Sequence, residues 1–349
     1  MDRRKATLGA AVAGVLAGAV ALGFVAAPAG AGQSPTLPKT TPDALVQSVL
    51  TASAPAMAGT VEIVNNLGLP SVPGLPTQVA DGTSQIRVWT DGKDRSRISI
   101  PSADSEQTIV DSGSTIYEWD STDRTVTEHS LKNDAEHAKT KADQQDLDPA
   151  TAAKDLVSAV KATSTVSVDG TDTVADRPAY ELVLAPKPGE RTLLREVRIA
   201  VDAQTHIPLR LTVLADNTNT PAVQIGFTSI DMGAQDPSLF QFTVPKGATV
   251  VNGDGKDQHS TDRATATDPK LVGSGWDTVV VAKVPNNSGK ANADQMLGLV
   301  KRFATPVHGS WGSGWVIGTN VGNALLTSDG RVAVGFVPQQ VLFQALSSK

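Results

Sequence analysis

The chain has 349 residues, and its 36 acidic and 30 basic side chains give a formal net charge of −6 at pH 7. An acidic protein without a basic run is poorly suited to bind nucleic acid or anionic lipid headgroups through bulk charge, so we expect no nucleic-acid partner. The absence of cysteine excludes disulfides, thiolate chemistry and a lipid attached to cysteine.

The N-terminal segment has the three parts of a secretory signal. Basic residues at 3–5 precede an apolar run over 6–27, and small residues follow at 29–31. We predict a signal peptide that is cleaved between Ala31 and Gly32, and therefore a secreted or extracytoplasmic protein. The alternative is a retained membrane anchor, because a run of this length can just span a bilayer. The weakly hydrophobic composition and the small-residue exit favour cleavage.

A linker and a first helix follow the signal segment. The stretch 32–40 is rich in Pro, Ser and Thr, as linkers are. Thr41 is then a suitable N-cap and Pro42 a suitable first helical residue, so the sequence predicts a helix that begins here. Leu45 and Val49 give this helix an apolar side.

A first strand is predicted over 59–66, and an unusual loop over 67–76 follows it. Three prolines and two glycines exclude a helix or a central strand in this loop. Its apolar residues are Leu67, Leu69, Val72 and Leu75. Because loops usually face water, they either cover the sheet edge as core or form a lid at the mouth of a hydrophobic cleft, and the sequence leaves both open. We take them, with Trp89 and Trp119, as candidate ligand-binding residues.

The rest of the first half is predicted as strands and one helix. Further strands are expected at 85–90, 97–100, 107–111, 115–119 and 124–129. The charged stretch 130–148 is predicted as a solvated loop. A helix capped by Asp148 extends to about Ala162 with an apolar stripe on one side, and a strand is expected at 166–168.

The stretch 178–250 predicts consecutive strands, each with one apolar face. Tyr180, Leu182 and Leu184, for example, alternate with Glu181. A period of two that persists through several segments predicts antiparallel strands with one face buried, and the short polar turns between them suit a meander of hairpins. The last predicted strand carries Phe240, Phe242 and Val244.

The order of these elements resembles the LolA/LolB/LppX/RseB superfamily. The resemblance is carried by the run Val-Asp-Ala-Gln-Thr-His-Ile-Pro-Leu-Arg at 201–210, by the strand after it, and by 236–240 and 242–245. It covers Thr41 to about Val251. It implies a mainly β (α+β) fold, an unclosed and strongly curved antiparallel half-barrel with helices over its concave face, which holds lipid or acyl chains. No ligand-contacting signature carries over residue by residue.

The composition changes after residue 251 and indicates a domain boundary. The predicted C-terminal domain contains a strand at 276–284, a helix at 291–303, two or three strands between 314 and 337, and a helix at 338–346. This layout resembles RseB and MucB, envelope-stress regulators with a small C-terminal α+β domain. The predicted division is a signal peptide at 1–31, a linker at 32–40, a half-barrel domain at 41–251, a linker at 252–268 and a C-terminal domain at 269–349.

A protease interpretation is weighed and set aside. Gly312-Ser313-Gly314-Trp315 resembles the opening strand of trypsin-like proteases, and Ser313 lies near His308 in the sequence. A Ser/His/Asp mechanism needs a base and an oxyanion hole, and the remaining residues 318–349 contain no histidine. The other histidines lack zinc-ligand spacing, and an EF-hand acid is missing after Asp254. We therefore expect no enzyme, no catalytic residue, no metal and no cofactor.

Two hypotheses for function follow. The first is a non-catalytic binding protein outside the cytoplasm that holds a lipid or lipoprotein acyl chain in a hydrophobic cleft. The second is a regulator that resembles RseB, binds a single-pass membrane anti-sigma factor and senses envelope lipid or lipoprotein. Only the C-terminal domain favours the second.

Overall fold

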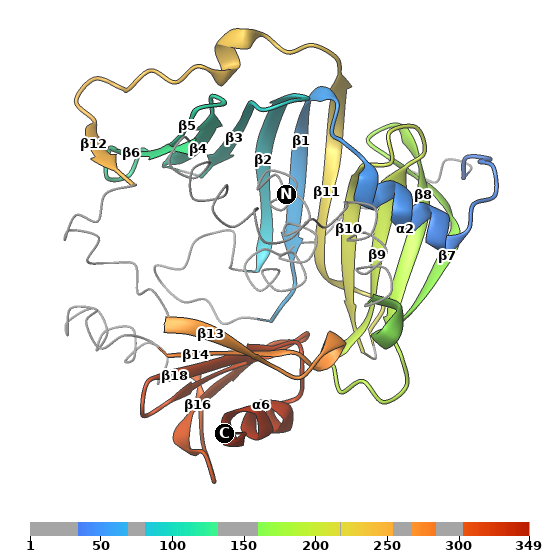
Figure 1. The fold of residues 1–349 in the computed structure, drawn as a ribbon, viewed down its shortest axis with the longest axis vertical. Helices are drawn as coiled ribbons and strands as arrows, with labels where there is room; N and C mark the ends of the chain where they lie inside the picture. The colour runs from blue at the N-terminus through green and yellow to red at the C-terminus, as the bar shows by residue number, and fades with distance from the viewer. Residues whose placement is uncertain are drawn as a thin grey trace, which may run out of the picture.

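The computed structural model describes residues 34–68, 81–102, 104–131, 160–216, 218–253, 267–283 and 303–348. These residues form two β-sheets (Figure 1). The larger sheet has 12 strands in the order β12-β6-β5-β4-β3-β2-β1-β11-β10-β9-β8-β7, and the smaller has six in the order β13-β14-β18-β17-β16-β15. Figure 1 shows the larger sheet as a curved, open sheet with the smaller sheet below it. The predicted mainly β class, with an unclosed sheet and a second small unit, is confirmed.

The larger sheet consists of β1 (Ala56–Asn65), β2 (Gly82–Asp91), β3 (Ser96–Pro101), β4 (Glu106–Asp111), β5 (Thr115–Asp120), β6 (Thr125–Ser130), β7 (Ser164–Val174), β8 (Arg177–Pro186), β9 (Leu194–Asp202), β10 (Pro208–Ala215), β11 (Pro221–Met232) and β12 (Thr249–Asn252). The smaller sheet consists of β13 (Thr267–Val272), β14 (Val279–Lys283), β15 (Thr305–Gly309), β16 (Gly312–Gly318), β17 (Asn323–Thr327) and β18 (Arg331–Gly335). The helical elements are α2 (Pro42–Thr51), η2 (Pro237–Phe240), η3 (Gly275–Asp277) and α6 (Gln339–Ser347).

The first helix begins as predicted. Thr41 is the N-cap of α2, its side chain accepts a hydrogen bond from Ala44 N, and a proline occupies the first turn. Such a cap satisfies one of the backbone donors that a helix start leaves unpaired. Leu45 is the buried residue of this helix, and it packs against Tyr180 and Leu182 of β8. The helix therefore covers one face of the larger sheet near its β7–β9 end.

The register of the strands defines two faces of the larger sheet. Residues directly opposite each other on antiparallel strands share a face, and neighbours along a strand alternate between faces. We call the face that carries Leu182, where α2 packs, the helix face, and the other side the opposite face. The predicted alternation holds for the apolar residues, but the opposite face is not simply solvated, because Glu181 is also buried there.

The predicted strand at Phe240–Val244 is wrong. Residues 237–240 form the 3-10 helix η2, which is capped by Asp236. The Phe242 ring stacks on Tyr117 of β5 with a centroid separation of 5.0 Å, and the buried Phe240 ring lies under the Arg95 guanidinium at 5.3 Å. These aromatic residues are therefore anchors by which the segment after β11 crosses the opposite face. The chain then pairs through β12, in parallel, with β6.

The C-terminal unit packs α6 on the six-stranded sheet. Its core contains Val279, Leu325 and Leu342, all fully buried. The predicted strand at 276–284 is shorter than expected, because Trp276 belongs to η3 and β14 begins at Val279. Strands β13 and β15 were not predicted; β13 begins inside the segment that was read as a linker. The predicted features at 130–148 and 291–303, and most of the helix at 148–162, lie outside the described residues.

A candidate ligand-binding face

The helix face carries an uninterrupted apolar row that crosses five strands. The register pairs its members in succession, and they are Leu182, Ile199, Leu211, Ile225 and Ile63. Four gaps of about 4.8 Å between neighbouring strands give the row a length of roughly 19 Å. No charged side chain interrupts it. Its shape and chemistry suit an extended hydrocarbon chain.

The middle of this row is less buried than its ends. Leu182 and Ile63 are buried, whereas Ile199, Leu211 and Ile225 are half-buried. Towards β2 the apolar surface widens, because Ile86, Val88 and Phe227 pack half-buried beside Val61 and Ile63. The helix face therefore keeps apolar surface that its neighbouring side chains do not cover and that a ligand can contact.

A glycine makes room for an aromatic ring on this face. Gly59 lies opposite Val88 on β2, and a Cβ atom there would stand 2.7 Å from Cε1 of Phe227. Real Cβ atoms do not approach a neighbour so closely, so the Phe227 ring can lie over β1 only because residue 59 has no side chain. The small residue thus widens the apolar surface at this end of the strands.

The smaller sheet bounds the helix face at the other end of the strands. A second apolar row on the same face lies two residues from the first, towards the smaller sheet. It consists of Val197, Val213 and Val223. Leu67 and Val321 pack on this row in a buried cluster, and Trp276 and Phe336 pack half-buried against it. Figure 1 shows the six-stranded sheet below the strand ends that carry these residues.

Polar contacts hold the two sheets together beside this cluster. Arg191, before β9, donates from Nε to Asp277 Oδ2 at 2.7 Å, and its side chain also reaches Gln344 of α6. On the β1 side, Asn320 N donates to the Leu67 carbonyl at 3.0 Å, and its side-chain amide donates to the Asn66 carbonyl at 2.9 Å. The contact between the sheets is therefore tied from two separate loops.

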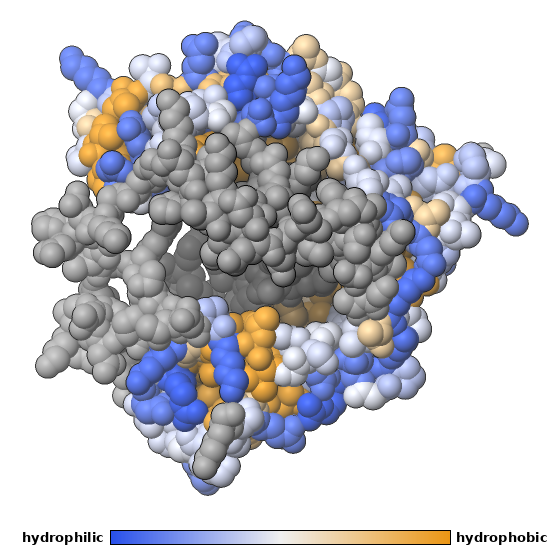
Figure 2. Space-filling view, viewed as in Figure 1, coloured by the Kyte–Doolittle hydropathy of each residue, from blue (hydrophilic) through white to orange (hydrophobic). Residues whose placement is uncertain are grey.

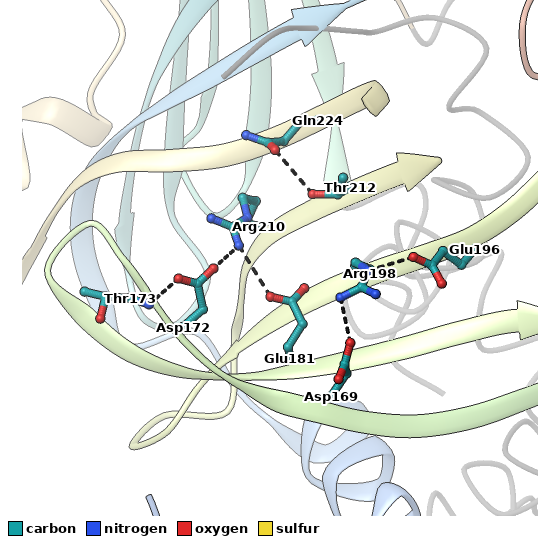
Figure 3. A network of polar contacts seen from close by, with 9 residues as sticks. All are labelled: Asp169, Asp172, Thr173, Glu181, Glu196, Arg198, Arg210, Thr212 and Gln224. Atoms are coloured by element: carbon teal, nitrogen blue, oxygen red, sulfur yellow. Dashed lines mark hydrogen bonds and ion pairs between the residues drawn. The ribbon is translucent and has the colours of Figure 1, made fainter. Parts of the chain in front are cut away.

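The opposite face carries a charged network across β7–β10 (Figure 3). Arg210 contacts Asp172 and lies 3.4 Å from Glu181, and Arg198 donates to Asp169 at 3.0 Å and to Glu196 at 2.8 Å. Burial raises the pKa of Glu181, and the Arg210 charge opposes that rise without cancelling it. The network lies on the side of the sheet away from the apolar row. Hydrocarbon and charge are thus segregated on the two faces.

Of the predicted site residues that the structure describes, Leu67 lies apart from Trp89 and Trp119. Leu67 is 2% exposed in the cluster between the two sheets. Trp89, which is paired with Arg97, and Trp119, which is paired with the buried Thr108, both lie on the opposite face. A ligand-binding role for these three residues stays a prediction. The candidate residues Leu69, Val72 and Leu75, and the predicted cleavage site between Ala31 and Gly32, lie outside the described residues.

Sequence reasoning missed the residues that form the row. The signal was present, because the apolar residues of each predicted strand alternated, but a single sequence does not reveal the register that aligns them across strands. It also missed Trp276, because that residue was assigned to a strand. The candidate tryptophans lie on β2 and β5, whereas the apolar row consists of Ile and Leu.

The serines of the protease-like stretch have other partners. Ser313 Oγ lies 3.1 Å from Ser328 Oγ, and Ser310 Oγ lies 3.0 Å from Ser347 Oγ. Within the described residues there is no cluster of three or more His, Cys, Asp or Glu side chains that could hold a metal ion. None of the helices in the described part of the chain is long and apolar enough to cross a membrane.

The smaller sheet also presents apolar surface. Figure 2 shows a hydrophobic area over the C-terminal unit, between hydrophilic areas. Among the described residues, Leu271 of β13 is the most exposed large hydrophobic side chain, at 66%. An exposed apolar patch bordered by polar residues is typical of protein–protein contact sites.

The fold and this face define a class of protein, an open β-sheet with one apolar face that is flanked by a helix and a second sheet. Among solved structures, the chain is similar to the Pseudomonas aeruginosa MucA/MucB complex, with 18% identity, a TM-score of 0.43, and coverage of 87% of this chain and 95% of that chain. A structure of MucB in complex with MucA(peri) has 18% identity and a TM-score of 0.45, and the match covers 88% of this chain and 97% of that chain. A LolA superfamily protein from Nitrosomonas europaea has 12% identity and a TM-score of 0.24, and the match covers 58% of this chain and 99% of that chain.

A LolA superfamily protein and MucB are therefore among the structures to which this chain is similar. No protein-family model matches the sequence, and no curated protein matches it.

Proposed function

We propose that this protein is a non-catalytic, extracytoplasmic binding protein that holds an acyl chain of a lipid or lipoprotein on its helix face. The apolar row from Leu182 to Ile63 carries the proposal, because it offers a continuous, uncharged surface of about the length of a long acyl chain. Burial of hydrocarbon contributes about 0.8 kcal/mol per methylene. Such a site binds chains tightly and discriminates headgroups weakly.

Native mass spectrometry of the purified protein tests the proposal most directly. A lipid that co-purifies appears as added mass, and organic extraction removes it. The same spectrum tests the predicted secretion, because a cleaved protein begins at Gly32. Intact Met1 on the protein recovered from outside the cytoplasm would contradict cleavage.

A pair of neighbouring substitutions locates the binding face. Ile86 lies half-buried on the helix face, and Gln85, the residue before it, lies exposed on the other side of β2. We expect Ile86→Asn to lower the affinity for a fluorescent fatty-acyl probe about tenfold, because full burial of such a side chain contributes roughly 1.5–3 kcal/mol. Gln85→Asn should leave the affinity unchanged.

Trp119, on the opposite face, provides the contrasting variant in the same experiment. If the chain binds on the helix face, Trp119→Phe leaves probe affinity unchanged, because Trp119 lies on the other side of the sheet. A large loss with Trp119→Phe and none with Ile86→Asn would move the site to the opposite face and overturn the proposal. Thermal unfolding of each variant separates lost binding from lost folding.

A second candidate is a regulator of the RseB/MucB kind, which binds a single-pass membrane anti-sigma factor and senses lipid. The observation that favours it is the C-terminal unit, which packs at the end of the helix face and carries the exposed Leu271. A pull-down from solubilised membranes distinguishes the two functions. Recovery of a single-pass membrane protein supports the regulator, and recovery of lipid alone supports the carrier.

A further inference from the structure

Trp276 occupies a fixed position at the boundary between the two sheets. Its indole Nε1 donates to Ser164 Oγ, at the start of β7, at 2.8 Å, and its backbone N donates to Glu190 Oε2 at 3.1 Å. The next residue, Asp277, accepts from Arg191. The ring is thus held from both its side chain and its backbone by residues of the larger sheet, although it comes from the C-terminal unit.

This position faces the end of the apolar surface. Trp276 packs half-buried against the same cluster as Ile199, Leu211 and Ile225, the half-buried middle of the apolar row. A large ring that two hydrogen bonds fix, and that keeps part of its surface uncovered, can act as a wall for an adjacent ligand. Phe336, which also packs half-buried against this cluster, extends this wall from the smaller sheet.

We infer that Trp276 is a specificity-determining residue that limits the length of the acyl chain on the helix face. The inference rests on the proposed function. A chain that follows the row from the Phe227 side towards β9 meets the Trp276 ring, which packs beside the Val197 row and bonds to the start of β7, and the ring blocks further methylenes. The C-terminal unit therefore sets which chains fit, in addition to any role in contacting partners.

The test uses the full-length protein and a homologous series of saturated fatty acids that displace a fluorescent fatty-acyl probe. For the wild type, affinity should rise roughly fourfold with each methylene and then reach a plateau at one chain length. Trp276→Ala removes the wall and should move the plateau to longer chains. Trp276→Phe keeps a ring at the position and should keep the plateau where it is.

Arg191→Ala is the control for a weakened contact between the C-terminal unit and the larger sheet. It removes the side-chain bonds to Asp277 and Gln344, keeps the backbone N–H bond to Asp277, and leaves the ring in place. A plateau that does not move in Trp276→Ala, or one that moves equally in Arg191→Ala, overturns the inference while leaving acyl binding intact. If no fatty acid displaces the probe from the wild type, the proposed function itself fails. Thermal unfolding confirms that each variant is folded under the assay conditions.

Discussion

Arg177 holds Asp202 through two hydrogen bonds, from Nε to Oδ2 at 2.6 Å and from the terminal guanidinium nitrogen to Oδ1 at 3.0 Å. The Asp202 side chain is 1% exposed, and Oδ1 also accepts from the backbone N–H groups of Gln204 and Thr205. His206 then takes a positive φ of 60°. The aspartate of the sequence motif is therefore the anchor of the β9–β10 turn.

Removal of this carboxylate should destabilise the fold. We expect Asp202→Ala to lower the free energy of unfolding by roughly 3 kcal/mol, because it leaves a guanidinium and two turn donors without their acceptor. The partial exposure of Arg177 keeps the loss near the low end of the range for broken buried pairs. Denaturant titration measures it. Asp216→Ala, at an exposed carboxylate after β10, is the control and should change little.

The pH dependence of the same pair has a defined sign. Burial alone would raise the pKa of Asp202, but the hydrogen bonds from Arg177 and Thr205 outweigh burial and lower it. A carboxyl whose pKa is depressed in the folded state stabilises the fold above its unfolded pKa of about 3.9 and loses that contribution as pH falls. The stability gap between wild type and Asp202→Asn should therefore be constant near neutrality and shrink below about pH 4. A gap that widens in acid contradicts this assignment.

Glu181 should show the opposite behaviour. Burial raises its pKa, so the folded state holds the proton more tightly than the unfolded chain does. The stability contribution of this group then falls as pH rises from the unfolded pKa of about 4.3 through the higher folded pKa. Glu181→Gln removes the titration and keeps the shape, so the variant should gain stability relative to wild type across this window. Parallel stability curves for the two proteins would refute the prediction.

These two carboxylates illustrate what the sequence could and could not predict. The hairpin at 201–210 was predictable because Asp, Pro and the alternating apolar residues are local signals. The burial of Glu181 was not, because it depends on Arg210 two strands away and on the cross-strand register. For the same reason the apolar residues were found strand by strand, but the row they form was not.

The strand predicted at Phe240–Val244 failed for a related reason. Its alternating aromatic residues match the period of a strand, but their partners are Arg95 and Tyr117, which lie more than a hundred residues earlier. Tertiary contacts with a distant part of the sheet therefore decided the local conformation. Pattern alone does not distinguish an aromatic residue that packs from a strand and one that packs from a covering segment.

Leu67 tests whether the start of the apolar loop is core or lid. It is 2% exposed between the two sheets, so we expect Leu67→Ala to cost about 2–5 kcal/mol of unfolding free energy. Because its contacts are with Val321 and the Val197 row, probe affinity should change much less than stability. Denaturant titration and probe binding on the same variant measure both. A tenfold loss of affinity with unchanged stability would instead favour a lid.

The last prediction concerns the boundary between the two units. We predict that the chain between β12 and β13 forms the linker, and limited proteolysis should cut there before it cuts inside Pro178–Val244. Preferential cutting within the strands would reject the boundary.

A cut at this boundary should not separate the two pieces. The buried cluster around Leu67 and Val321, and the hydrogen bonds of Arg191 and Asn320, connect the sheets independently of the linker. We therefore expect the nicked protein to elute as one species in size-exclusion chromatography at micromolar concentration. Arg191→Ala combined with Val321→Asp removes one polar tie and places a charge in the apolar contact, which is costly to bury without a partner. The nicked double variant should elute as two species, whereas separation of the nicked wild type would mean that the linker, and not the interface, holds the units together.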